Sequence, residues 1–276
     1  MGHKEKSKDK KDKRLQQISL LRTIPYSDHQ RWWSKETIAV VTGANRGIGF
    51  EICKQLAYHG ITVILTSRDD GVAIESIKVL QEGGLDVACH KLDVLDSSSI
   101  NQFAEWLKEN YGGLDILVNN AGVNFNFGSD NSVENAHKVI DTNYYGTKKM
   151  IQAMIPLMKP SNVEEVIDET VNTFVQQVED GSWVSGGWPP KFTDYSVSKL
   201  AVNAYTRFLS KKLCERPEGE KIYINCYCPG WVKTALTGYA GSVTVEEGAD
   251  TGVWLSLLPD QAITGKFFAE RREIHF

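Results

Sequence analysis

Residues 38–56 read Ile38-Ala39-Val40-Val41-Thr42-Gly43-Ala44-Asn45-Arg46-Gly47-Ile48-Gly49-Phe50-Glu51-Ile52-Cys53-Lys54-Gln55-Leu56. A short apolar run rich in β-branched residues comes first, which is typical of a strand buried on both faces. Three glycines follow, and then Ile48, Ile52 and Leu56 recur on one stripe of an amphipathic helix. The segment therefore predicts a strand, a tight turn and the N-terminus of a helix.

The spacing of the glycines indicates the kind of turn. Gly43, Gly47 and Gly49 give G-x-x-x-G-x-G, which differs from the general dinucleotide fingerprint G-x-G-x-x-G. Such a turn lets backbone N–H groups approach a pyrophosphate, and the helix dipole favours the negative charge. A purely structural βα turn is the alternative. The strand before it, the helix after it and the motifs below favour nucleotide binding.

The rest of the chain alternates predicted strands and helices from Thr37 onward. This alternation predicts an α/β protein with a Rossmann-type, doubly wound parallel sheet. Further strands are expected at residues 61–66, 86–91, 114–118, 222–228 and 266–269. A long helix is expected over 133–158. Shorter helices are expected to bury Ile74, Ile77 and Leu80, then Ile100, Phe103 and Leu107 after a cap at Ser97, and finally Leu200, Ala204 and Phe208.

Composition fits one domain of residues 36–276 that follows a basic, disordered tail of residues 1–35. Residues 31–34 are expected to pack just before the first strand. With 41% hydrophobic residues and a net charge of −4, the chain has no footprint for nucleic acid and no run of about 20 apolar residues for a membrane. Five cysteines, an odd number, indicate reduced thiols in the cytoplasm. Cys226-x-Cys228 lacks a second ligand pair, so no metal site is expected.

A second informative motif is Tyr195-Ser196-Val197-Ser198-Lys199 at the start of a helix. Residues four apart share a helical face, so Tyr195 and Lys199 are expected to point the same way. A neighbouring ammonium stabilises a phenolate and is expected to lower the pKa of the phenol. The pair can then hand a proton to a carbonyl oxygen as a hydride reaches the carbon. A solvated helix face is the alternative interpretation.

Four motifs together resemble the short-chain dehydrogenase/reductase family. They are Thr42-Gly-Ala-Asn-Arg-Gly-Ile-Gly49, Asn119-Asn-Ala-Gly122, Tyr195-x-x-x-Lys199 and Cys228-Pro-Gly230. One branch of the family, the plant carbonyl reductases of the menthone, neomenthol and salutaridine type, is the most similar. The motifs that indicate this branch are Arg46 within the glycine turn, Thr142-Asn-Tyr-Tyr-Gly146, Trp188-Pro189 and the Cys-Pro-Gly-Trp-Val-Lys-Thr ending at Thr234. The resemblance covers residues 37–276.

The resemblance implies a site for NADPH and a catalytic group of Tyr195, Lys199 and Asn143. In this group Asn143 would hold a water that links Lys199 to solvent. Asp93 and Val94 would border the adenine, residues 119–122 the ribose, and residues 229, 230 and 234 the carboxamide. The implied cofactor-binding residues are Thr42, Gly43, Asn45, Arg46, Gly47, Ile48, Gly49, Arg68, Asp93, Val94, Asn119, Ala121, Gly122, Tyr195, Lys199, Pro229, Gly230 and Thr234.

The residue after the second expected strand indicates which nicotinamide cofactor is used. An acidic residue there would accept the ribose hydroxyls of NAD, whereas Arg68 carries a guanidinium suited to a 2′-phosphate. By resemblance, Arg46 and Arg68 would embrace that phosphate. The adjacent Asp69 is acidic and would instead favour NAD. NADPH is therefore expected, with a small ketone or aldehyde as substrate.

The sequence departs from the family before Tyr195. The family carries a catalytic serine at the end of a central strand, but Lys159 is followed almost at once by a helix over 166–178 that resembles the insertion of this branch. One central strand and its serine are therefore expected to be missing between residues 159 and 163. Ser182 and Ser185 are candidate substitutes, although glycines flank them as in a loop. The insertion would cover the face used for dimers, so a monomer is expected.

Two functions remain open from the sequence. The first is NADPH-dependent reduction of a small carbonyl compound with Tyr195 as general acid. The second is a catalytically impaired, shortened chain that binds NADPH or a partner without efficient turnover. Losing one hydrogen-bond donor to the substrate oxygen typically costs about 100- to 1,000-fold in turnover.

Overall fold

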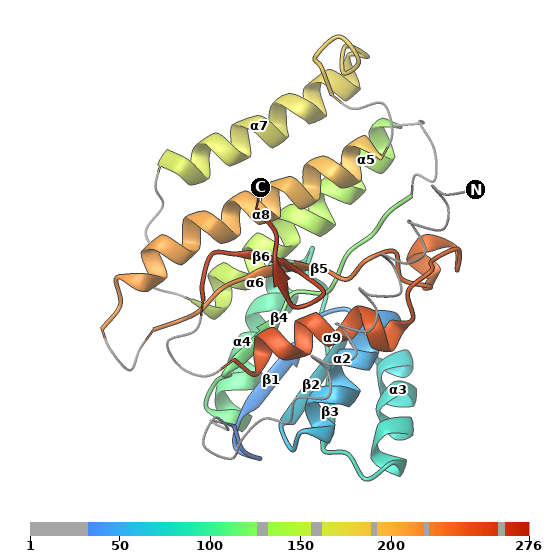
Figure 1. Ribbon diagram of the computed structural model, residues 1–276, viewed down its shortest axis with the longest axis vertical. Helices are drawn as coiled ribbons and strands as arrows, with labels where there is room; N and C mark the ends of the chain where they lie inside the picture. Colours follow the sequence, from blue (N-terminus) through green and yellow to red (C-terminus); the bar gives the residue numbers. More distant parts are fainter. Residues whose placement is uncertain are drawn as a thin grey trace, which may run out of the picture.

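The computed structural model describes residues 33–125, 132–155, 162–188, 192–217, 221–258 and 263–275. Its first half is a parallel sheet of four strands in the order β3-β2-β1-β4, flanked by helices (Figure 1). The strands are β1 (Ile38–Val41), β2 (Thr62–Ser67), β3 (Val87–Lys91) and β4 (Ile116–Val118). The helices between them are α2 (Gly47–Tyr58), α3 (Asp70–Glu82) and α4 (Ser97–Tyr111). The predicted α/β class is confirmed.

Side chains of β1 pack into two separate hydrophobic cores, one on each face of the sheet. Ala39 and Val41 pack with Ile52 and Leu56 of α2. Ile38 and Val40 pack on the other face in a cluster that contains Phe103 of α4. Because successive side chains of a strand point to opposite faces, the unbroken apolar run is what a strand covered on both sides requires. The sheet is doubly wound, as predicted.

Two of the sequence expectations about these helices were wrong. In α3 the buried residues are Ala73 and Leu80, whereas Ile74 is 44% exposed. The N-cap of α4 is Asp96, whose side chain accepts a hydrogen bond from the backbone N–H of Ser98, and Ser97 is the first helical residue. Trp33 packs before β1 as expected and donates its indole N–H to the carbonyl of His59 at 3.2 Å. Residues 1–32, which include most of the expected tail, lie outside the described residues.

The helix expected over 133–158 is three consecutive pieces. They are α5 (Val133–Ile140), the π-helical turn η2 (Asp141–Gly146) and α6 (Thr147–Met154). Residues 156–158 lie outside the described residues. A π-helical turn inserts one extra residue, and such turns occur often at functional sites. This one contains Asn143.

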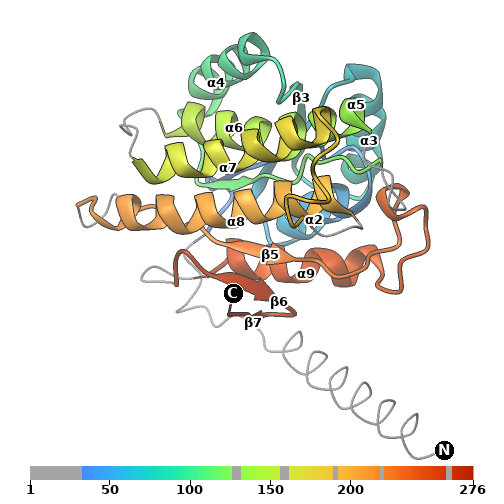
Figure 2. The same cartoon turned by 90° about the horizontal axis from the view of Figure 1, so that it is seen from above.

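Two long helices pack against this composite helix. They are α7 (Asn162–Glu179) and α8 (Thr193–Cys214), which run side by side in Figures 1 and 2. The buried stripe of α8 comprises Val197, Ala201, Tyr205, Phe208 and Leu209. Leu200, which was expected in the stripe, is 60% exposed. The helix therefore faces the core at positions 197, 201, 205 and 209, which follow the spacing of four.

The C-terminal strands form a second sheet. It contains β5 (Cys226–Cys228), β6 (Phe267–Ala269) and β7 (Arg272–Glu273), with β5 and β6 parallel and β6 and β7 antiparallel. Only the last three residues of the strand expected over 222–228 are paired. Within the described part of the chain, β4 and β5 are not paired with each other, so the parallel strands fall into two sheets. The expected site of the missing strand, at residues 159–163, coincides largely with residues that the structure does not describe.

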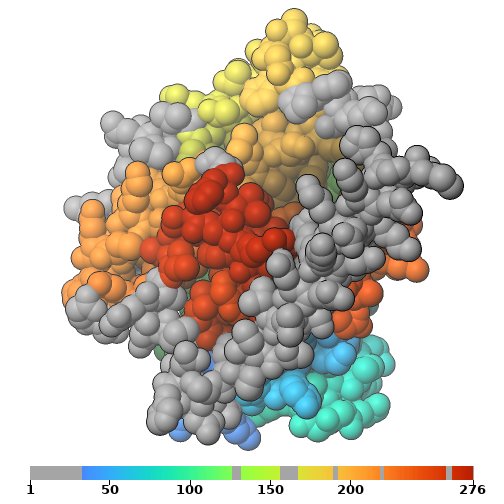
Figure 3. Space-filling view, in the orientation of Figure 1, coloured from blue at the N-terminus to red at the C-terminus, as the bar shows by residue number. Residues whose placement is uncertain are grey.

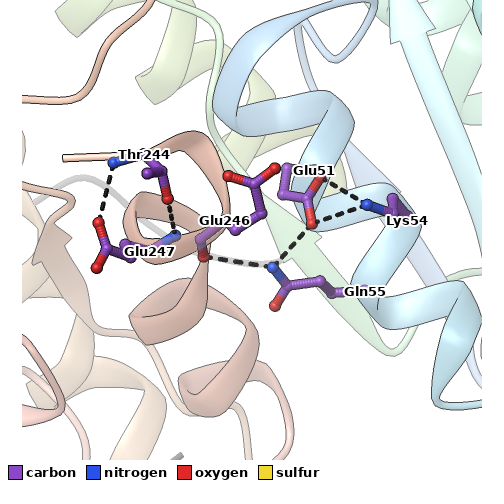
Figure 4. A network of polar contacts seen from close by, with 6 residues as sticks. All are labelled: Glu51, Lys54, Gln55, Thr244, Glu246 and Glu247. Carbon is purple, nitrogen blue, oxygen red and sulfur yellow. Dashed lines mark hydrogen bonds and ion pairs between the residues drawn. The ribbon is translucent and has the colours of Figure 1, made fainter. Parts of the chain in front are cut away.

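Helix α9 (Val245–Ser256) connects the second sheet to the first half of the chain. Gln55 of α2 donates to the carbonyl of Glu246 at 3.4 Å and to Glu51 at 3.1 Å (Figure 4). Arg271 pairs with Asp250 of α9, with Nε 2.9 Å from Oδ2. In Figure 3 the segment that carries β6 and β7 lies on the surface between α8 and the N-terminal half. Helix packing thus joins the two sheets.

Candidate active site

The glycine-rich turn after β1 closes tightly on the segment after β4. Gly43 and Gly47 have φ values of +59° and +61°, which favour glycine. A Cβ atom on Gly43 would lie 2.9 Å from Cα of Ala121. The side chain of Asn120 donates to the carbonyls of Thr42 at 2.9 Å and Gly43 at 3.1 Å. These contacts fix the turn at the carboxyl end of the sheet, where ligands of open parallel sheets bind.

The N-terminus of α2 is suited to an anion. Arg46 is its N-cap, and its side chain makes no capping hydrogen bond within the described residues. The first turn also contains no acidic residue, so the helix dipole is not countered there. Ser76 of α3 donates to the carbonyl of Asn45 at 3.0 Å and supports the turn from the other side. Free N–H groups at such a helix end fit a pyrophosphate.

The segment after β2 places Arg68 on the surface and gives Asp69 a structural role. Oδ1 of Asp69 accepts a hydrogen bond from the backbone N–H of Val72 at 3.0 Å, so Asp69 caps α3. Arg68 and Arg46 are both exposed. The capping bond weighs against Asp69 as the acceptor for ribose hydroxyls, which was the one sequence feature that pointed away from NADPH.

The segments after β3 and β4 supply the next expected residues. Val94 is buried and lies against Gly146 of η2, where a Cβ atom would be 2.9 Å from Cγ2 of Val94. Oδ1 of Asp93 accepts from the backbone N–H of Leu95 at 2.9 Å. Among the residues that the structure describes, the buried Oδ1 of Asn119 has no hydrogen-bond partner. An acceptor buried without a partner is costly, and it fits a donor such as a ribose hydroxyl.

Asn143 is fully buried and joins the segment after β4 to α8. Its Oδ1 accepts from the backbone N–H of Val123 at 2.8 Å, and its Nδ2 donates to the carbonyl of Val123 at 2.9 Å. The same Nδ2 lies 3.1 Å from the hydroxyl of Ser198. Asn143 therefore holds Val123 and Ser198 together, immediately beside Gly122 and Lys199.

Tyr195 and Lys199 share a face of α8, as the motif predicted. Nζ of Lys199 lies 5.5 Å from the centre of the Tyr195 ring. It also lies beside Gly122, where a Cβ atom would be 3.4 Å from it. Burial lowers the pKa of Lys199 to about 8. Burial, and secondarily Cys228, raises the pKa of Tyr195, so the expected lowering of the phenol pKa was wrong for this structure.

The end of β5 reaches both parts of this site. Cys228 contributes to the raised pKa of the Tyr195 phenol. Gly230 has a φ value of +83°, which favours glycine. The methyl group of Thr234 is 3.5 Å from the position of a Cβ atom on Gly47. The segment 228–234 thus lies between the glycine-rich turn and Tyr195, although β5 belongs to the other sheet.

The structure brings Gly47 next to Thr234, and Gly122 next to Asn143 and Lys199. It adds Ser198, which sequence reasoning missed, and a structural role for Asn120, which was expected only as part of the ribose segment 119–122. Asn120 fixes the glycine-rich turn, and Ser198 is bonded to Asn143. The doublet Asn119-Asn120 and the position of Ser198 next to Lys199 were the available signals. The hydroxyl of Ser185 donates to the carbonyl of Ser182 at 2.8 Å within the turn that follows α7.

The described residues contain no group of three or more possible metal ligands and no helix long and apolar enough to cross a membrane.

The fold and the site together define a Rossmann-type enzyme. The short chain dehydrogenase family matches residues 37–243. The chain is 36% identical to (+)-neomenthol dehydrogenase of Arabidopsis thaliana, over 86% of this chain and 96% of the relative. It is 34% identical to carbonyl reductase [NADPH] 1 of Bos taurus, over 88% and 99%. Salutaridine reductase from Papaver somniferum has a similar structure, with a TM-score of 0.76 and 32% identity over 84% of this chain and 99% of the other.

The chain therefore belongs to the short-chain dehydrogenase family of oxidoreductases. The predicted resemblance to the plant menthone, neomenthol and salutaridine reductases is confirmed at about one-third identity. The alignment with neomenthol dehydrogenase extends over 291 positions. The aligned 86% of 276 residues is about 237, so about 54 of those positions are gaps in this chain. The relative therefore has segments without a counterpart here.

Proposed function

We propose that the chain reduces a small ketone or aldehyde with NADPH as the hydride donor. The observation that carries this proposal is the position of the Lys199 ammonium, beside Gly122 and Asn143 and 5.5 Å from the ring of Tyr195. A proton donor and a cation thus adjoin the segment that follows β4, at the same edge of the sheet as the glycine-rich turn. This arrangement suits a carbonyl group that takes up a hydride on carbon and a proton on oxygen.

The residues after the strands would hold the cofactor. The N-terminus of α2 and residues 43–49 would bind the phosphates, residues 93 and 94 would border the adenine, and residues 119–122 would contact the ribose. Residues 229, 230 and 234 would contact the carboxamide, and Lys199 the second ribose. The exposed Arg46 and Arg68 would bind the 2′-phosphate, because a guanidinium matches phosphate geometry. Bound NADPH would supply the hydride, and four relatives are named as NADPH carbonyl reductases.

Tyr195 would be the proton donor. Burial raises the pKa of its phenol, so the group holds its proton at neutral pH and can give it to the substrate oxygen. Lys199 would then stabilise the phenolate that remains, provided that its amine is protonated. Its pKa of about 8 allows this at neutral pH. Asn143 would keep Val123 and Ser198 in place around Lys199, and its expected link to a water stays a prediction.

We further propose that the chain is shortened near residues 159–163. The split between β4 and β5 and the alignment gaps support this. Without the serine of the family, one donor to the substrate oxygen is lost, and turnover would be about 100- to 1,000-fold lower than in a chain that has it. A transcript that encodes the strand and the serine at this place would show that a longer form exists.

We also propose that the chain is a monomer, because α7 covers α5 and α8. A location in the cytoplasm is proposed because all five cysteines are free.

The test is consumption of NADPH by the purified chain with a panel of small ketones and aldehydes. We expect oxidation that depends on the carbonyl compound. The Tyr195→Phe variant should lose at least about 100-fold of this rate while it keeps its affinity for NADPH. Tyr58→Phe, at a tyrosine that is 82% exposed, is the matched control and should keep the full rate. Equal rates for Tyr195→Phe and the original chain would contradict the mechanism.

A further inference from the structure

A partly buried polar cluster joins α7 to the π-helical turn η2. The hydroxyl of Tyr144 donates to Oδ1 of Asp168 at 2.6 Å, and the ammonium of Lys148 donates to Oδ2 of Asp168 at 2.7 Å. Tyr144 is only 1% exposed and Lys148 only 9%. Both oxygens of one carboxylate are thus engaged by two buried donors from the same stretch of helix. The Asp168 side chain itself is 30% exposed, so the cluster is closed to water on the side of the two donors.

The cluster lies where the helices that carry the catalytic residues meet. Tyr144 directly follows Asn143 in η2, and Lys148 follows one turn later in α6. The Tyr144 ring packs edge-on against Tyr205 of α8, with centres 6.4 Å apart. The ammonium of Lys148 is 5.7 Å from the centre of the same Tyr205 ring. The Asp168 carboxylate thus bonds Tyr144 and Lys148, and these two side chains in turn contact Tyr205 of α8. Helix α8 also carries Tyr195 and Lys199.

The geometry of η2 makes this bond important for Asn143. Consecutive residues of a helix point in different directions, and here Asn143 points toward Val123 and Ser198 while Tyr144 points toward α7. A rotation of η2 that broke the bond between Tyr144 and Asp168 would therefore also move Asn143. A π-helical turn interrupts the regular hydrogen-bond ladder, so side-chain bonds carry more of its positioning.

We propose that Asp168 and Tyr144 are positioning residues that hold η2 in the orientation in which Asn143 bonds Val123 and Ser198. The consequence for the cofactor rests on the proposed function. With Asn143 displaced, Gly122 and Lys199 would lose their support, and the nicotinamide end of the cofactor site would loosen. The adenosine end, at Arg46 and Arg68, would be unaffected.

Two neighbouring tyrosines provide a matched pair of variants. Tyr144→Phe removes the hydroxyl that bonds Asp168 and keeps the ring. Tyr145→Phe removes the hydroxyl that bonds Asn172 of α7 at 3.0 Å, an exposed bond on the next residue. Both variants lose one bond between η2 and α7, and both retain the ion pair of Lys148 with Asp168. A difference between them therefore reports on the part-buried bond between Tyr144 and Asp168.

The first readout is hydrogen–deuterium exchange of residues 119–125 in the chain without ligand. The amide of Val123 donates to Asn143, so its exchange reports on the position of that side chain. We expect Tyr144→Phe to raise the exchange rate at Val123 about tenfold, the factor that one ordinary hydrogen bond provides. Tyr145→Phe should change it less than twofold. Unchanged exchange in Tyr144→Phe, or equal increases in both variants, would overturn the proposal whether or not the chain is an active reductase.

The second readout compares two ligands, NADPH and 2′-phospho-ADP-ribose, which lacks the nicotinamide. Tyr144→Phe should weaken NADPH about tenfold and the fragment less than twofold, because only the nicotinamide end depends on Asn143. Equal weakening of both ligands would show a general loss of structure and would overturn the role in the cofactor site. If the original chain binds neither ligand, the proposed function fails, and the exchange experiment still decides on the positioning of η2. Asp168→Ala, which removes the acceptor of the Tyr144 hydroxyl, should reproduce the exchange result.

Discussion

Burial acts in opposite directions on the two ionisable side chains of the site. It raises the pKa of the Tyr195 phenol and lowers the pKa of the Lys199 ammonium to about 8. In both cases the neutral form is favoured, as expected when a charge loses contact with water. Both groups are still protonated at neutral pH, which is the state that proton donation to a carbonyl oxygen requires.

The pKa of Lys199 predicts how reduction depends on pH. Below about pH 8 the ammonium is charged and stabilises the Tyr195 phenolate, and above it the charge is lost. The kcat/KM of carbonyl reduction should therefore be level below pH 8 and fall as the pH rises, approaching tenfold per pH unit. A series of kcat/KM measurements from pH 6 to pH 10 checks this. Lys199→Arg keeps its charge and should lack the fall, whereas a level profile in the original chain would contradict the role of Lys199.

Arg68 should set the preference for NADPH over NADH. Arg68→Ala removes an exposed guanidinium from the end of β2, and we expect the affinity for NADPH to fall about 10- to 100-fold while the affinity for NADH stays within twofold. Titration of cofactor fluorescence measures both. Lys78→Ala, which removes an exposed positive charge from the neighbouring α3, is the control and should leave the preference unchanged.

At the residue scale, the motifs predicted which side chains gather but not what holds them. The glycines, Tyr195 and Lys199 stand at fixed spacings, so local pattern was enough to single them out. Their supports come from distant parts of the chain, as Asn120 does for Gly43 and Ser198 does for Asn143. The pKa of Tyr195 was mispredicted for the same reason, because burial by the whole fold outweighs one neighbour in the sequence.

At the element scale, the connection from β1 to α2 leaves no room for a side chain at Gly49. A Cβ atom on Gly49 would lie 2.4 Å from Nδ2 of Asn120 and 2.9 Å from Cα of Ala44. The first contact is with the side chain that holds the glycine-rich turn, and the second is with backbone. Gly49 is therefore required by the close approach of α2 to the segment after β4.

Gly49→Ala should lower the free energy of unfolding by about 1–3 kcal/mol, because either the turn or Asn120 must shift. It should also weaken NADPH binding, since the turn would form the phosphate site. Chemical denaturation and cofactor titration measure the two effects. In Gly71→Ala the nearest atom is Oδ1 of Asp69 at 3.3 Å, and this control should change stability by less than about 1 kcal/mol. Equal stability of the two variants would contradict the account of Gly49.

Helices and strands were predicted where local periodicity was strong. The apolar stripe of α2 and the buried residues of α4 follow their patterns closely. The π-helical turn η2 has no local signature, because side chains of α7 and α8 support it. Leu200 was misplaced because Ala201 occupies the buried position of α8, and a large apolar side chain on the exposed face misled the pattern.

At the scale of the whole molecule, β1 and β2 were predicted because they are buried on both faces. The strand expected over 222–228 was overestimated because pairing, not apolar character, determines where a strand ends. Ile224 and Asn225 hydrogen-bond residues 263–266, which lead into β6, but only Cys226 to Cys228 align with β6 as a strand. No sequence pattern revealed that α9, rather than strand pairing, connects the two sheets.

We propose that this chain binds NADPH although its strands are divided between two sheets. The melting temperature of the purified chain with NADPH, compared with NADH at the same concentration, tests this most directly. Saturation at 100 times the dissociation constant stabilises the native state by about 2.7 kcal/mol, which corresponds to about 5–10 °C for a domain of this size. We expect such a rise with NADPH and a clearly smaller one with NADH. No rise with NADPH, or equal rises with both cofactors, would contradict the account.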